Sequence, residues 1–206
     1  MFDALFTTTT EYKKLSHALS GKGACALFGL PASGRAQVYA ALCRQLDKPL
    51  CIVTPGEAEA TRFAADLNTL GIPAAVFPAR DYVLRPIEGT AREYEYRRLA
   101  VLGELVGGRL CAVAVPAEAL TQFTTPKEDF CANTRTLHAG DTLLRDDLLA
   151  ALFGAGYTRR AQVDGPGQFS VRGDIVDIFA PDQKMPVRME FWGDEIDTLH
   201  TFDLTT

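Results

Sequence analysis

Short apolar runs alternate with helical patterns over the first 125 residues, and this alternation limits the possible folds most strongly. The apolar runs cover residues 23–29, 49–55, 74–78 and 110–116. Apolar residues at helical spacing cover residues 9–19, 34–46, 57–70 and 91–108. Continuous apolar strands that alternate with helices are typical of a parallel sheet covered on both faces. The sequence therefore predicts an α/β domain over residues 1–125.

The pattern changes at residues 124–129. Beyond them the chain has shorter runs in which apolar and polar residues alternate, one helical pattern around residues 145–155, and a glycine-rich turn at residues 165–167. A period of two is typical of strands with one buried face, with apolar side chains inside and charged side chains outside. The sequence predicts a small α+β domain over residues 126–206, built mainly from antiparallel strands.

Charge and composition narrow the class of protein. The net charge is −5, which argues against general affinity for nucleic acid, because binding to its backbone needs clustered Lys and Arg. Most of the negative charge belongs to residues 126–206, which hold 14 acidic and 8 basic residues. The N-terminus lacks the apolar core of a signal peptide, and no apolar run approaches the roughly 20 residues of a membrane span. We therefore expect a cytoplasmic protein with no membrane partner.

The five cysteines show no CxxC spacing. Cys25, Cys51 and Cys111 lie in apolar runs, which predicts small core residues in a reducing cytosol rather than a disulfide framework. The three histidines are far apart in the sequence, and nothing in their spacing indicates a metal site.

The segment from Gly29 to Ala36 has the outline of a phosphate-binding P-loop, because Gly29 and Gly34 have the spacing of GxxxxGK[ST] between a predicted strand and a predicted helix. Arg35 stands where the motif has Lys, and Ala36 has no oxygen for Mg²⁺. Pro116 follows the strand after which a second acidic motif would be expected. The sequence predicts a degenerate P-loop-NTPase-like domain that does not hydrolyse ATP. Weak anion binding at the helix N-terminus remains an alternative.

A second candidate site lies in residues 157–203, where Arg172, Asp174 and Asp177 stand close together. The simplest interpretation is that these charged side chains lie on a solvent-exposed face of a strand, where they contribute little to stability or binding. A metal-dependent nuclease is an alternative, with Asp174, Asp177 and Glu190 as ligands of Mg²⁺. Two observations argue against it. Trp192 occupies the position where such a site usually has Lys, and residues three apart on a strand point to opposite faces.

The same stretch resembles a known family. The motifs that carry the resemblance are GYTR at 156–159, GQFSVRGDIVDIFAP at 167–181, PVRMEFWGDEI at 186–196 and FDLTT at 202–206. They resemble the domain that the excision-repair protein UvrB shares with the bacterial transcription–repair coupling factor Mfd, and residues 1–125 resemble the preceding domain more loosely. The altered P-loop, and the short segment after residues 110–116 where UvrB has a long β-hairpin, favour the N-terminal region of the Mfd branch.

The resemblance implies a binding module rather than an enzyme. In this family the second domain binds UvrA, the damage-recognition ATPase. Matched position by position, the implied contact residues are Arg159, Arg172 and Glu190, together with Ser170 where the family has a basic residue. We expect these charged residues to share one exposed face.

The resemblance also implies that the chain is a fragment of a longer bacterial protein. The missing parts would bind RNA polymerase and DNA and would use ATP and Mg²⁺ for translocation. We expect no cofactor, no metal and no catalytic residue in residues 1–206.

Overall fold

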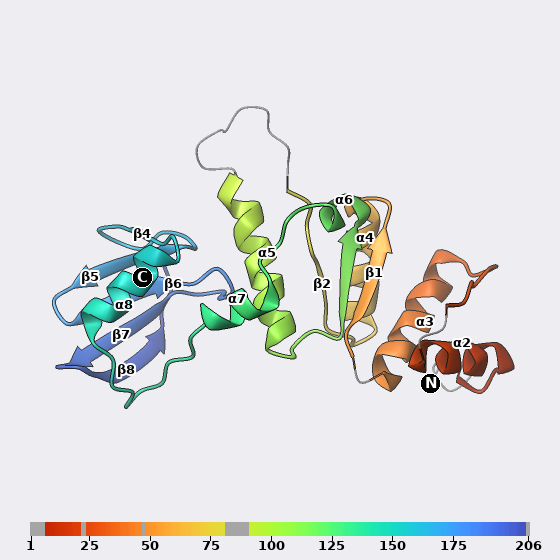
Figure 1. The fold of residues 1–206 in the computed structure, drawn as a ribbon, viewed down its shortest axis with the longest axis horizontal. Coiled ribbons are helices and arrows are strands. Elements are labelled where there is room, and N and C mark those ends of the chain that lie inside the picture. The colour runs from red at the N-terminus through yellow and green to blue at the C-terminus, as the bar shows by residue number, and fades with distance from the viewer. Residues whose placement is uncertain (1–6, 22–23, 47, 81–90, 205–206) are drawn as a thin grey trace. The chain divides into compact units, whose positions relative to one another are not determined.

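The computed structural model describes residues 7–21, 24–46, 48–80 and 91–204, and they form two compact units (Figure 1). The first unit comprises the described residues of Met1–Tyr94 and Val101–Phe123. The second unit comprises Glu95–Ala100 and the described residues of Thr124–Thr206. Among the described residues, no helix combines the length and the apolar character that crossing a membrane requires.

The first unit is built on a parallel sheet of three strands in the order β1-β3-β2. Its elements are α2 (Thr10–Ser20), α3 (Ala32–Gln45), β1 (Leu50–Thr54), α4 (Glu57–Thr69), β2 (Ala74–Val76), α5 (Ala91–Val106), β3 (Ala112–Pro116) and α6 (Ala117–Leu120), although residues 95–100 of α5 group with the second unit. The alternating strands and helices expected from the sequence are confirmed from α2 to β3, apart from the strand expected at residues 23–29, whereas the short helix α6 was not predicted.

The central strand β3 is buried on both faces. Ala112 and Ala114 pack in a core with α3 and α4, whereas Val113 and Val115 pack in a second core with Val101 of α5. Successive side chains of a strand point to opposite faces, so a single apolar run supplies both cores. Burial of the central strand on both faces is typical of a parallel sheet that is covered by helices on both sides.

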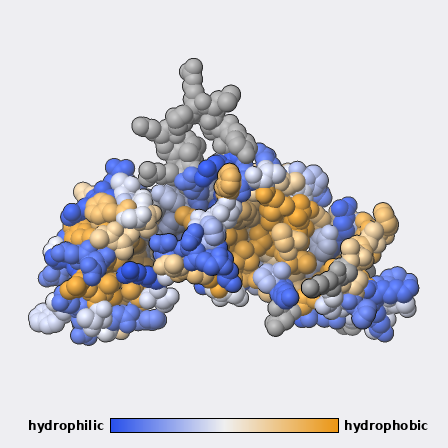
Figure 2. All heavy atoms as spheres, viewed as in Figure 1, coloured by the Kyte–Doolittle hydropathy of each residue, from blue (hydrophilic) through white to orange (hydrophobic). Residues whose placement is uncertain are grey.

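The predicted strand at residues 23–29 is wrong in its described part. Residues 24–29 contain no strand and are exposed, including Leu27 and Phe28. An apolar run becomes a strand only when another strand supplies hydrogen bonds, and among the described residues β1 pairs with β3 and not with residues 24–29. Val53 of β1 is also exposed, and Figure 2 shows hydrophobic residues at the surface over β1, β2 and β3.

The burial of the cysteines also differs from the expectation. Cys25 and Cys51 are exposed and Cys111 is half-buried, so the prediction of core cysteines is wrong for the first two. Cys43, which no pattern had singled out, is the buried one. Burial, and next the neighbouring Cys111, raises the pKa of the Cys43 thiol to about 11. Its reactive thiolate is therefore scarce at neutral pH.

The second unit is an α+β fold with a five-stranded sheet in the order β4-β5-β6-β7-β8. Its elements are α7 (Lys127–Ala132), α8 (Arg145–Gly154), β4 (Thr158–Arg159), β5 (Gln168–Arg172), β6 (Ile175–Phe179), β7 (Val187–Trp192) and β8 (Glu195–Thr201). Strands β5 to β8 are antiparallel, as expected. The two-residue strand β4, which pairs with β5 in parallel, and the short helix α7 were not predicted.

Helix α8 covers one face of this sheet (Figure 1). Leu148 and Leu152 of α8 pack against Phe169, Val176 and Met189 of the strands. We call this side of the sheet the α8 face. The opposite side carries Ser170, Arg172, Ile175, Asp177, Arg188 and Glu190, which the strand register aligns with one another, and we call it the polar face.

The turn at residues 165–167 packs closely against Tyr96, which belongs to the second unit. Gly167 has φ +75°, and its N–H and carbonyl bond Phe179 and Thr158 at 2.7 and 2.9 Å. A Cβ atom at this position would overlap the phenol of Tyr96. Gly167 therefore meets two requirements at once, a left-handed backbone and a close approach.

Replacing Gly167 by alanine is expected to lower the free energy of unfolding of the second unit by about 2 kcal/mol or more, since Tyr96 must move and the left-handed backbone is strained. Gly173→Ala is the matched control. Gly173 has φ +59° with no atom within 4 Å of the added Cβ, so it should cost only about 1 kcal/mol. Urea unfolding followed by circular dichroism measures both, and equal losses would contradict the role given to Tyr96.

Candidate functional site

The segment Gly29–Ala36 does not have the setting of a P-loop in this structure. No strand precedes it among residues 24–28, and α3 begins at Ala32, so that Arg35 N–H already donates to the Pro31 carbonyl at 3.0 Å. Ala36 is buried and offers no oxygen to a metal. The guanidinium of Arg35 lies 3.8 Å from the carboxylate of Glu59 on α4. The one basic side chain of the segment therefore has an acidic neighbour within the protein.

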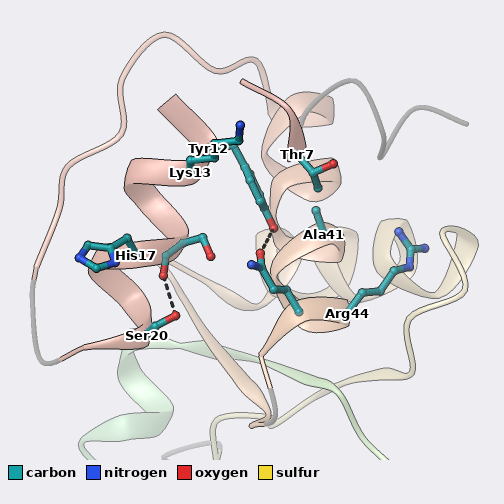
Figure 3. Close-up of a pocket in the computed structure, with 9 residues that line it drawn as sticks. Thr7, Tyr12, Lys13, His17, Ser20, Ala41 and Arg44 are labelled. Atoms are coloured by element: carbon teal, nitrogen blue, oxygen red, sulfur yellow. Dashed lines mark hydrogen bonds between the residues drawn. The ribbon is translucent and has the colours of Figure 1, made fainter. Parts of the chain in front are cut away.

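A cavity of about 520 Å³ lies between α2 and α3 (Figure 3). Tyr12 donates to Gln45 Oε1 at 2.9 Å across it. His17 and Arg44 contribute to its lining, but Figure 3 shows their side chains pointing to opposite sides rather than toward each other. Arg44 also donates to the Leu70 carbonyl at 2.6 Å. His17 and Arg44 therefore do not converge on a common ligand position.

A buried ion pair forms the middle of the polar face. Asp177 is 3% exposed, and its two oxygens accept hydrogen bonds from Nε and Nη2 of Arg188 at 2.7 and 2.8 Å. These bonds raise the pKa of Arg188 above its ordinary value. The Ser170 hydroxyl donates to Asp177 at 3.5 Å, and the ring of Phe202 lies 4.8 Å from the guanidinium. The expectation that charged strand residues lie outside is therefore wrong for Asp177, because a bidentate arginine satisfies its carboxylate inside.

Next to this pair, toward the hairpin ends, three chemically different side chains lie on the polar face. Arg172 and Glu190 flank Ile175 in the register, and Trp192 stands two residues after Glu190 on the same strand. Residues two apart on a strand point to the same side, so Trp192 shares this face. Arg172 is exposed, Glu190 is half-buried and Trp192 is 83% exposed. We call Arg172, Glu190 and Trp192 the exposed patch.

Trp192 is not among the contact residues that the family resemblance implies. The available signal was weak but present, because Trp192 is the single tryptophan of the chain and ends a strand immediately before a Gly-Asp turn.

Two other predicted contact residues lie elsewhere. Ser170 is 1% exposed, so its side chain is not part of the protein surface. Arg159 is exposed but pairs in register with Phe169, whose ring belongs to the core beneath α8. Tyr157, two residues earlier, packs against the same core. The register therefore places Arg159 on the α8 face, whereas Arg172 and Glu190 lie on the polar face.

The residues of the nuclease hypothesis do not form a metal site. The carboxylate of Asp177 accepts hydrogen bonds from Arg188. Asp174 lies in the turn after β5, with its carboxylate 3.3 Å from Arg145 Nη1. Within the described ranges, no three His, Cys, Asp or Glu side chains lie in an arrangement that could hold a metal ion. The geometry does not favour this alternative.

Comparison with known proteins finds a family that resembles most of the second unit. The family described as UvrB interaction domain matches residues 136–206, which include α8 and all five strands. Residues 136–206 are therefore similar to the UvrB interaction domain family. The family match thus contains both the buried ion pair and the exposed patch.

Similarity extends beyond this domain. The transcription-repair-coupling factor of Mycobacterium tuberculosis is 38% identical over 182 residues, covering 84% of this chain and 14% of that protein. The corresponding factor of Bacillus subtilis is 29% identical over 179 residues, covering 86% and 15%. The UvrABC system protein B of Chlorobium limicola is 28% identical over 193 residues, covering 86% and 28%. The expected resemblance to both proteins is confirmed, and the chain spans less than a third of the length of these relatives.

Proposed function

We propose that this chain is the UvrA-binding module of a transcription-repair coupling factor, which recruits nucleotide excision repair to a stalled RNA polymerase. The observation that carries the proposal is the exposed patch of Arg172, Glu190 and Trp192 within the UvrB interaction domain. Binding to RNA polymerase and DNA, and ATP-driven translocation, would belong to parts of the longer protein outside residues 1–206.

The chemistry of the exposed patch suits a protein partner. Trp and Arg are the residues most enriched among the energetic centres of interfaces, and a guanidinium can bind a partner carboxylate through two parallel bonds. Glu190 adds a negative charge on the same face, across Ile175 from Arg172, so a partner with the complementary pair of charges is preferred over one with a single sign. The buried Asp177–Arg188 pair joins β6 to β7, the strand that also carries Glu190 and Trp192, and so supports the backbone next to these two side chains.

We further propose that the first unit hydrolyses no ATP and takes no cofactor through residues 29–36, as a degenerate P-loop would. Ala36 cannot bind Mg²⁺, and the guanidinium of Arg35 already faces Glu59.

Titration of the labelled chain with purified UvrA tests the proposal. We expect saturable binding, with Trp192→Ala weakening it about tenfold or more because an exposed aromatic anchor is lost. Phe28→Ala is the matched control, since Phe28 is 88% exposed but belongs to the first unit, and it should leave the affinity unchanged.

Two parallel reactions keep the alternatives testable. The chain is mixed with Mg²⁺ and DNA, and separately with Mg²⁺ and ATP. Cleavage of DNA or release of phosphate, together with failure to bind UvrA, would replace the binding module with an enzyme.

A further inference from the structure

One arginine of α8 reaches across the end of the sheet to the turn that carries Arg172. Nη1 of Arg145 donates to the carbonyl of Gly173 at 2.8 Å and lies 3.3 Å from Oδ1 of Asp174. Gly173 and Asp174 form the connection between β5 and β6, directly after Arg172. A single guanidinium therefore fixes both the backbone and the side chain of this turn.

The same turn is bonded to the other half of the exposed patch. The carbonyl of Asp174 accepts a hydrogen bond at 2.9 Å from the N–H of Phe191, which stands between Glu190 and Trp192 on β7. Arg145, the turn and β7 thus form one continuous chain of hydrogen bonds. Any displacement of the turn changes the spacing between Arg172 on one side and Glu190 and Trp192 on the other.

We propose that Arg145 is a positioning residue for UvrA binding, an inference that rests on the function proposed above. It acts through the turn at residues 173–174 and sets the distance between the positive and negative members of the exposed patch. Three anchors with fixed spacing lose less conformational entropy on binding than mobile ones, so the loss of Arg145 weakens binding even though no contact with UvrA is removed.

The stability of the domain should depend little on this interaction. The side chain of Arg145 is 39% exposed and that of Asp174 is 79% exposed, and exposed ion pairs contribute little to folding. Binding and folding therefore respond differently to the same substitution, which separates a positioning role from a structural one.

The test is a double-mutant cycle on UvrA affinity with Arg145→Ala, Asp174→Ala and the combined variant. We expect Arg145→Ala to weaken binding about threefold to tenfold with a nearly unchanged melting temperature. The combined variant should bind almost as well as the weaker single variant, because both changes disrupt one interaction. Arg145→Lys, which keeps a donor in reach of the turn, should recover most of the affinity.

Hydrogen exchange of the free chain tests whether Arg145 acts through the turn. The loss of a direct contact with UvrA would leave exchange in the free chain unchanged. In Arg145→Ala, the amides of residues 173–175 should exchange faster than in the parent. Arg135→Ala is the matched control, an exposed arginine of the same unit that precedes α8, and it should change neither exchange nor affinity.

Different failures have different meanings. Parental affinity in Arg145→Ala overturns the positioning role, and additive losses with unchanged exchange overturn it in favour of a direct contact. If Arg172→Glu still abolishes binding in the same assay, the proposed function stands without this inference. If neither substitution affects binding, the proposed function itself fails.

Discussion

Replacing Arg172 by glutamate is expected to abolish measurable UvrA binding while the domain stays folded. The substitution reverses the one positive charge of the exposed patch and places like charges against the partner, which costs several kcal/mol at an interface. In the free chain Arg172 makes one hydrogen bond at an exposed position, from Nη2 to the Ala161 carbonyl at 3.0 Å. Its loss should lower the free energy of unfolding by about 1 kcal/mol at most. A UvrA titration beside a thermal melt measures both effects.

Arg159→Glu is the matched control for this experiment. It makes the same change of charge in the same domain, but the register places Arg159 on the α8 face. We expect its affinity for UvrA to stay within about threefold of the parent, as for a rim charge outside the contact. A folded Arg172→Glu variant with parental affinity would show that the patch is not the contact. An unfolded one would make Arg172 a structural residue.

The largest effect on stability is expected from Arg188→Ala. The substitution leaves the carboxylate of Asp177 buried with only the Ser170 hydroxyl, at 3.5 Å, as a side-chain partner. Breaking a fully buried pair typically costs 3–5 kcal/mol, and the 33% exposure of the Arg188 side chain reduces this to about 2–3 kcal/mol. For a unit of this size the melting temperature should fall by about 10 °C or more.

The double variant Asp177→Leu/Arg188→Met separates charge burial from packing. It removes both charges and keeps most of the apolar volume, so it should be more stable than Arg188→Ala alone. Thermal unfolding by circular dichroism compares the three chains. A melting temperature of Arg188→Ala within about 2 °C of the parent would mean that the Asp177 carboxylate finds water, and the ion pair would lose its structural role.

The sequence predicted those parts of the fold that depend on local periodicity. Helix α4 begins and ends within one residue of the prediction, because its apolar spacing is regular and Gly56 precedes it. The segment 24–29 is apolar too, but whether it forms a strand depends on a neighbouring strand to pair with. No local sequence pattern specifies that neighbour. The two residues of β4 are too few to show any period.

The candidate site was predictable to a similar extent. Arg172 and Glu190 follow from motif positions on β5 and β7, the two strands that pair with β6. The face of Arg159 depends on its pairing with Phe169, and a shift of register by one residue would reverse it, so sequence alone does not decide it. Asp177 looks like a surface charge until β7 brings Arg188 opposite to it. Arg145 of α8 contacts a turn 28 residues later in the sequence. No short motif covers such a sequence separation, so this contact could not be predicted.

Hydrogen–deuterium exchange of the chain with and without UvrA tests the central claim most directly, because it locates the contact without any substitution. We predict slower exchange in the presence of UvrA at residues 170–175 and 188–195, which form the hairpin ends beside the exposed patch. Residues 146–159, which include most of α8 and the strand β4, should be unchanged. Protection confined to the first unit or to the α8 face would contradict the assignment of the polar face as the UvrA-binding surface.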